Sequence, residues 1–192
     1  IRATESTITD RLPPRMEIRR GAALETPHIM LLVNDPGHIM IEQIGSYIHS
    51  SQKEPLYNAP LMMDSGSITG WAVPADCSLS IEKALEELYQ ANTCSDGSVL
   101  MFAVGDGNHS LATAKALWED HKQQCGGARL ANGSISLPKN IEHNPLRYAL
   151  VEIVNLYDSG LTFEPIHRVI FGADSKQLIG FLQSALGGSV IS

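Results

Sequence analysis

The residues whose types and spacing could do chemistry gather in one short segment, FAVGDGNHSLATAKA, at 102–116. An apolar run ends there, turn residues follow, and a helix-compatible stretch begins. Such a turn leaves backbone N–H groups at a helix N-terminus, where these donors and the helix dipole favour an anion, typically phosphate. Gly105 and Gly107 would let a ligand approach the backbone closely. The segment therefore predicts a phosphate-binding strand–turn–helix at 105–110.

Four polar side chains are expected at the mouth of this turn: Asp106, Asn108, His109 and Ser110. Their spacing matches neither GxGxxG nor the GxxxxGK motif of phosphate loops, so the local pattern leaves an alternative open. That alternative is an ordinary turn in which Asp106 or Asn108 caps the helix. His109 favours the ligand-binding interpretation, because a plain cap needs only one oxygen.

Two further segments place polar residues within or beside apolar ones. In PIHRVIF, at 165–171, His167 and Arg168 interrupt an apolar strand and point to opposite faces, so one of them can face a site. The alternative is an edge strand with routine polar residues. In IRATEST, at 1–7, Arg2 and Glu5 taken alone are typical surface residues.

The elements that must position these residues follow from periodicity and turn signals. Strands are predicted at 28–34, 98–104, 161–163 and 166–171, and a hairpin at 56–73 around Asp64-Ser65-Gly66. Helices are predicted at 38–50, at 80–91 with Ser80 as N-cap, at 109–122, and after Asp174, whose spacing to Gln177 resembles a capping box. Asn144-Pro145 opens the strongest predicted helix, with an apolar stripe that runs to Tyr157. The fold class is therefore α/β or α+β, with a mixed β-sheet flanked by helices.

Composition indicates a globular protein. The 192 residues are 43% hydrophobic and 18% charged, and we predict one α/β region over 1–192 with a flexible loop near 126–143. A net charge of −7 argues against nucleic acid as a partner, and no apolar run approaches the ~20 residues that span a membrane. The first twenty residues carry five arginines against three acids, which is either a solvated edge or an anion-facing wall.

Cysteine and histidine patterns predict no metal site. The three cysteines form no CxxC pair, and the seven histidines show no HExxH motif. Free thiols in an acidic chain favour the cytoplasm. The chain begins at Ile1 without a signal-peptide pattern, and both ends look like cuts through a longer protein.

Together the three polar segments resemble the bacterial and archaeal family called Domain of Unknown Function 1015. Its D-G-H-H-R-like motif corresponds to Asp106-Gly107-Asn108-His109-Ser110, its P-T-H-R-V-like motif to Pro165-Ile166-His167-Arg168-Val169, and its R-x-x-E-like motif with a following Asp-Arg to Arg2, Glu5, Asp10 and Arg11. The resemblance implies that this chain is the central part of a longer protein. It also implies a remote likeness to the ParB/sulfiredoxin-like fold, which includes CTP-binding partition proteins, sulfiredoxin and free-serine kinases.

The chain departs from the family motif at two positions. Ser110 stands where the motif commonly has Arg, and Asn108 replaces its first His. An Arg would clamp phosphate oxygens bidentately, whereas Ser offers one hydroxyl. Arg168 or Arg2 would then have to supply the positive charge.

The function expected from the resemblance is phosphoryl transfer from a nucleotide, with Mg²⁺, to a small metabolite. In this hypothesis the 105–110 turn holds phosphate, Arg2 and Arg168 neutralise charge, and Glu5 or Asp106 acts as general base or Mg²⁺ ligand. The remaining pair, His109 and His167, orients substrate or donates protons. The alternative is a non-catalytic sensor of a nucleotide or phosphometabolite. A DNA-partition or nuclease role is opposed by the acidic charge, and a metal-dependent hydrolase by the missing ligand spacing.

Overall fold

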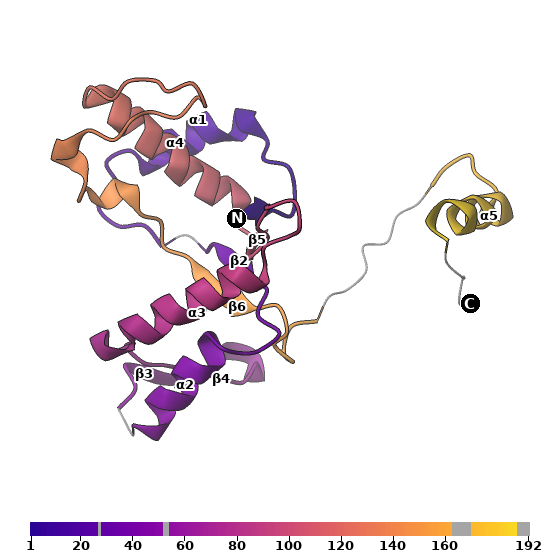
Figure 1. Cartoon of the computed structure of the whole chain (residues 1–192), viewed down its shortest axis with the longest axis horizontal. Helices are drawn as coiled ribbons and strands as arrows, with labels where there is room; N and C mark the ends of the chain where they lie inside the picture. The colour runs from indigo at the N-terminus through magenta and orange to yellow at the C-terminus, as the bar shows by residue number, and fades with distance from the viewer. Residues whose placement is uncertain (27, 52–53, 163–169, 188–192) are drawn as a thin grey trace. The chain divides into compact units, whose positions relative to one another are not determined.

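The computed structural model describes residues 1–26, 28–51, 54–162 and 170–187 (Figure 1). Contacts divide the chain into two compact units, Ile1–Leu161 and Thr162–Ser192. The first unit contains both β-sheets and helices α1 to α4, and the second contains α5. Strands and helices are mixed along the chain, which confirms the predicted α/β class.

A mixed sheet of four strands forms the centre of the first unit. Its strands, in spatial order, are β1 (Arg2–Ala3), β5 (Phe102–Asp106), β2 (Met30–Val33) and β6 (Glu152–Asn155). The outer strand β1 runs parallel to β5, whereas β2 is antiparallel to β5 and parallel to β6. Because β2 has strands on both sides, its residues Leu31–Val33 are all buried, as a continuous apolar run predicts.

Helices pack at the two ends of strand β2 (Figure 1). They are α1 (Leu12–Arg19), α2 (Ile41–Ser50), α3 (Ser78–Ala91) and α4 (Asn108–Gln124). Leu31, near the start of β2, packs with Val104 and with Leu111 of α4, and α1 lies against α4. Val33, at the other end, packs with Ala84 and Leu88 of α3. Helix α4, which carries the predicted phosphate-binding residues, therefore packs near the start of β2, and the α2–α3 pair packs near its other end.

Several predicted elements are confirmed with small shifts. The hairpin consists of β3 (Tyr57–Pro60) and β4 (Ser67–Gly70), paired antiparallel. Helix α3 begins at Ser78, so the prediction that Ser80 is its N-cap is wrong. A short 3-10 turn, Ala75–Cys77, leads directly into the helix and starts it two residues earlier. In the second unit, α5 (Ser175–Leu186) starts with the Asp174 side chain accepting from Gln177 N, as the capping-box spacing predicts.

The predicted helix from Asn144 to Tyr157 is wrong. Asn144 does cap, through its side chain and Leu146 N, but it caps only a 3-10 turn, Pro145–Arg147. The chain then extends into β6, where Ile153 and Val154 pair in register with Leu31 and Leu32. Both β-branched residues lose less freedom in a strand than in a helix, and the open edge of β2 supplies the backbone partners. Tertiary pairing therefore overrode the helical periodicity.

The boundary between β5 and α4 also differs from prediction. Gly105 and Asp106 belong to β5, Asn108 to Ser110 belong to α4, and only Gly107 lies between the two elements. The predicted four-residue turn at 105–108 is therefore wrong, because a bulged pairing of Met30 with Asp106 carries the strand two residues further.

Segment 126–143 contains one short 3-10 turn, Lys139–Ile141, and an isolated bridge between Arg129 and Ile135. Two of its apolar side chains, Ile135 and Ile141, are buried. The predicted strand at 166–171 lies largely outside the described residues. In the part of the chain that is described, no helix has the length and apolar character that crossing a membrane requires.

Candidate functional site

The candidate site is the junction at which β5 gives way to α4. Gly107 separates them with a left-handed backbone, at φ 81°, and no side chain caps the helix. The carboxylate of Asp106 accepts from Gly107 N at 2.7 Å, so it does not reach the helical N–H groups. The first intrahelical bond runs from Leu111 N to Gly107 O. The backbone N–H groups of residues 108–110 precede that bond and form the donor set that an anion would need.

Packing alone explains the two glycines of this junction. A Cβ on Gly107 would lie 2.5 Å from His28 O and 2.9 Å from Ile29 Cα. Both distances are shorter than a non-bonded contact allows, and backbone atoms cannot move aside as a flexible side chain can. A Cβ on Gly105 would lie 3.1 Å from Leu32 Cγ. Both residues therefore let β5 and the start of α4 approach β2, a role that needs no ligand.

The N-terminal segment runs alongside this junction. Thr4 Oγ1 donates to Val104 O at 2.7 Å, and Ile8 N donates to His109 Nε2 at 3.1 Å. Glu5 lies between these two anchors, and Arg2 pairs in register with Ala103. Two segments about a hundred residues apart in sequence thus meet where the motifs predicted a shared site.

Asn108, the first residue of α4, carries a buried polar group without a partner. Its side chain is only 6% exposed, and its Nδ2 has no acceptor among the described residues. An orphaned amide donor inside the protein costs free energy, and such exceptions concentrate where a ligand or water completes the bonding. The predicted alternative, in which Asn108 caps the helix, is wrong because Asn108 is itself helical.

Two residues that the sequence analysis missed, His28 and Glu152, lie at the same end of the sheet. Met30 pairs with Asp106 on one side and with Glu152 on the other. Glu152 Oε2 lies 2.8 Å from His28 Nε2, and both side chains are exposed. The helix predicted over Glu152 hid it, since its place two strands away from Asp106, across Met30, depends on strand pairing. This edge therefore presents the carboxylates of Asp106 and Glu152 and the imidazole of His28.

A third missed residue, Arg19 of α1, lies beside Ser110. Arg19 Nη1 donates to Ser110 O at 2.8 Å, while the same guanidinium forms a bidentate pair with Glu25. The hydrogen bond from Arg19 lowers the pKa of Glu25 and outweighs the opposite effect of its partial burial. Arg19 thus brings a positive charge, partly neutralised by Glu25, to the turn where the resembled motif carries Arg at position 110.

Two of the five arginines in the first twenty residues, Arg19 and Arg20, are engaged in ion pairs. Arg20 pairs with Glu17 at 3.2 Å and with Asp120 of α4 at 3.1 Å. Like Arg19, it therefore has acidic partners and ties α1 to α4. Arg2, whose strand pairs with β5, has no ion-pair partner among the described residues, and the same holds for Arg11 and Arg15.

Of the ten residues predicted for the site, eight fall in the described chain. The structure gathers Glu5, Asp106, His109 and the helix start at Gly107 to Ser110 at one edge, with Gly105 and Arg2 on the adjoining strands. The other two, His167 and Arg168, lie outside the described residues. In the described ranges, no three His, Cys, Asp or Glu side chains are grouped as metal ligands.

Comparison with known proteins gives one match. A family model described as "Protein of unknown function (DUF1015)" matches residues 1–186. No curated protein and no solved structure matches. The likeness to the ParB/sulfiredoxin-like fold is therefore not confirmed by these comparisons.

Proposed function

Because the chain belongs to the family described as Protein of unknown function (DUF1015), whose description names no activity, we propose a function from the geometry of the β5–α4 junction. The proposal is a nucleotide-dependent phosphotransferase that acts on a small metabolite. The observation that carries it is the start of α4: no side chain caps this helix of 17 residues, and the buried side-chain amide of its first residue, Asn108, has no acceptor among the described residues.

Each remaining residue takes a role that its position permits. A nucleotide phosphate would accept from the N–H groups of residues 108–110, at the positive end of the α4 dipole. Mg²⁺ is commonly held by one or two carboxylates together with substrate phosphates, so Asp106 and Glu5 suffice without a three-residue metal cluster. In transfer, the acceptor oxygen attacks the terminal phosphorus, its proton passes to a carboxylate, and the bond to the leaving phosphate breaks.

A non-catalytic nucleotide sensor is the second candidate, and one observation favours it. The described cations beside the first turn of α4 are few, because Ser110 has no charge and Arg19 is paired with Glu25. Phosphoryl transfer requires charge neutralisation, whereas binding alone can rely on backbone donors. The two candidates share the site and differ in turnover.

The test measures binding and turnover on the same protein. Calorimetry with ATP, ADP and CTP in the presence of Mg²⁺ reports binding, and phosphorus NMR with a panel of hydroxylated metabolites reports transfer. We expect Asp106→Asn and Glu5→Gln to abolish transfer, while Glu82→Gln on the distant helix α3 leaves it unchanged. Binding without transfer across the panel supports the sensor. Absence of binding for all three nucleotides rejects both candidates.

A further inference from the structure

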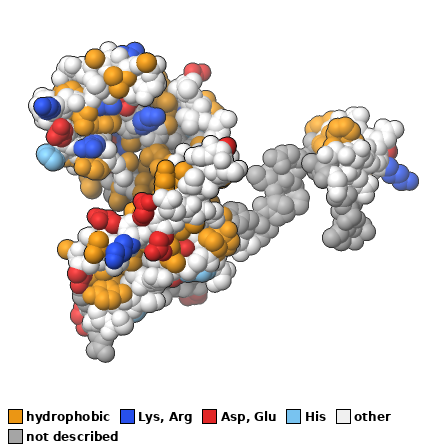
Figure 2. All heavy atoms as spheres, in the orientation of Figure 1, with side chains coloured by type: hydrophobic (Ala, Val, Ile, Leu, Met, Phe, Trp, Pro, Cys, Tyr) orange, Lys and Arg blue, Asp and Glu red, His pale blue; other side chains and the backbone are white. Residues whose placement is uncertain are grey.

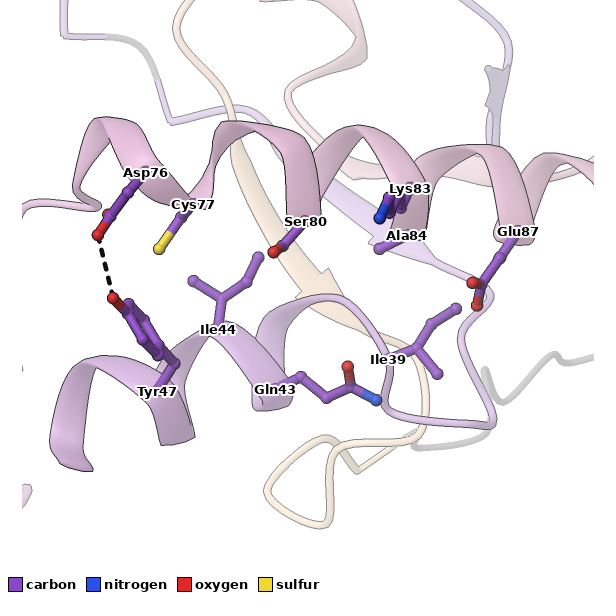
Figure 3. Close-up of a pocket in the computed structure, with 10 residues that line it drawn as sticks. All are labelled: Ile39, Gln43, Ile44, Tyr47, Asp76, Cys77, Ser80, Lys83, Ala84 and Glu87. Carbon is purple, nitrogen blue, oxygen red and sulfur yellow. Dashed lines mark hydrogen bonds between the residues drawn. The ribbon is translucent and has the colours of Figure 1, made fainter. Parts of the chain in front are cut away.

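A second hollow lies between α2 and α3, which pack at the end of β2 opposite the start of α4 (Figure 3). Its volume of about 430 Å³ is within the range of small-molecule sites. Figure 3 shows it as a trough with α3 along one wall and α2 along the other. Nothing in the β5–α4 junction lines it, so any ligand it takes is additional to the proposed nucleotide.

The floor of this trough is apolar. Ala84 is 6% exposed and Cys77 is 4% exposed, while Ile44 reaches in from α2. One end is closed by a hydrogen bond from Tyr47 to Asp76 at 3.0 Å, drawn as a dashed line in Figure 3. This bond raises the pKa of the Tyr47 hydroxyl, because a phenolate would face the Asp76 carboxylate. At the closed end the hydroxyl and the carboxylate are thus bonded to each other, and the apolar floor next to them is left for the hydrocarbon part of a ligand.

The other end of the trough carries opposite charges. Lys83 and Glu87 both line it from α3, and Gln43 projects toward it from α2. Neither Lys83 nor Glu87 has an ion-pair partner among the described residues. They stand four positions apart with Lys first, which is the less favourable order for a pair within one helix. Both charges are thus left to bind groups of a ligand.

We propose that this trough binds a zwitterionic metabolite with an apolar body, of the size of leucine or methionine. The ligand carboxylate would pair with Lys83 and its ammonium with Glu87 and the Gln43 amide oxygen. Its hydrocarbon part would cover Ile44, Ala84 and the Cys77 thiol. Acidic side chains gather over this part of the face in Figure 2, which disfavours an anion that brings no ammonium.

The test uses calorimetry on the full chain with leucine, isovalerate, which lacks the ammonium, and serine, which lacks the apolar body. Leucine should bind, and the other two should bind at least tenfold more weakly. Glu87→Gln and Lys83→Gln should each weaken leucine about fivefold to tenfold. The matched control is Glu82→Gln on the same helix, which should bind leucine as the wild type does. Failure of leucine to bind, or equal affinity in all three variants, overturns the proposal.

Cys77 supplies a second readout that does not depend on those variants. In a chain carrying Cys94→Ser and Cys125→Ser, Cys77 is the single thiol, and its reaction with a thiol reagent can be followed directly. Leucine should slow that reaction severalfold by covering the trough floor, and serine should not. An unchanged rate at saturating leucine places the ligand elsewhere and also rejects the proposal.

Discussion

At the scale of single residues, the candidate site depends on which side chains have partners. His109 is held by Ile8 N, Arg19 by Glu25 and by Ser110 O, and the Asn108 amide has no acceptor. A hydrogen bond within the protein contributes to stability, whereas a donor or ring nitrogen that it leaves unbonded can contribute to binding. Substitutions at these positions therefore separate the two effects.

His109→Ala is expected to weaken nucleotide binding by about 1–3 kcal/mol, the range for a hydrogen bond to a charged group. It should also lower the melting temperature, because Ile8 N loses its acceptor. Calorimetry with ATP and a thermal melt measure both quantities, with the exposed His143→Ala as control. If the melting temperature falls and the affinity does not, His109 only anchors the N-terminal segment.

Ser110→Arg is expected to tighten binding of a phosphorylated ligand roughly tenfold at low salt, and less at high salt. Glu25 lies beside Ser110, around a cavity of about 220 Å³, and would compete for the new guanidinium. Adding Glu25→Gln should therefore increase the gain. Titrations with ATP, ADP and CTP at two salt concentrations measure it. No gain for any nucleotide, in either background, would mean that the start of α4 is not a phosphate site.

The Arg19–Glu25 pair predicts a pH dependence of stability. The hydrogen bond from Arg19 lowers the pKa of Glu25 from its ordinary value of 4.5. A lowered pKa in the folded state stabilises the protein above the unfolded value, and this contribution is lost as the pH falls through the folded value. Urea unfolding should show Glu25→Gln less stable than wild type at pH 7, with the difference vanishing well below pH 4. The ion pair of Glu17 with Arg20 is largely exposed, so Glu17→Gln should lower the free energy of unfolding at pH 7 by less than Glu25→Gln does. Equal losses in the two variants would contradict this account.

At the scale of elements, the β5–α4 connection depends on close backbone packing. Gly107 combines a left-handed φ of 81° with an approach that leaves no room for a Cβ. The site is therefore positioned by the sheet itself rather than by a flexible loop. The shape of the junction therefore depends on Gly107, where a residue with a side chain would not fit.

Gly107→Ala is expected to destabilise the protein by about 3 kcal/mol or more, because backbone strain and overlap with His28 O act together. Gly97 is the matched control: its φ is 79°, and a Cβ there would meet nothing within 4 Å. Gly97→Ala should cost only the left-handed strain, about 1–2 kcal/mol. Urea denaturation measures both, and equal costs would show that the contact with residues 28–29 is not tight.

At the scale of the whole molecule, the charge distribution limits the partners. The net charge is −7, and in the basic N-terminal segment Arg19 and Arg20 form ion pairs with acids, whereas Arg2, Arg11 and Arg15 form none among the described residues. Nucleic-acid binding requires basic side chains left free to meet phosphates. The acidic net charge therefore disfavours nucleic acid as a partner.

Duplex DNA is accordingly expected not to bind. Fluorescence anisotropy at physiological salt should show no saturation up to the micromolar range in which non-specific DNA binders typically associate, roughly 10⁻⁶–10⁻⁴ M. The measurement should be repeated with Mg²⁺ and CTP, because a nucleotide could neutralise or rearrange the site. Salt-dependent binding in either condition would contradict this reading of the charge.

The sequence by itself determined the elements whose signals are local. The apolar run of β2, the stripes of α2 and α3, the hairpin at Asp64-Ser65-Gly66 and the Asp174 cap each depend on residues within a few positions of one another. The family was also recognisable from the three motifs, because they stand in order along the chain.

Only the tertiary structure decided what depends on distant partners. Residues 152–155 became a strand because β2 offered an open edge, although their spacing suited a helix. The same pairing placed Glu152 across Met30 from Asp106, and the packing of α1 on α4 brought Arg19 to Ser110. The apolar residues of this segment are locally compatible with a helix and with a strand, so the available backbone partner decides between them.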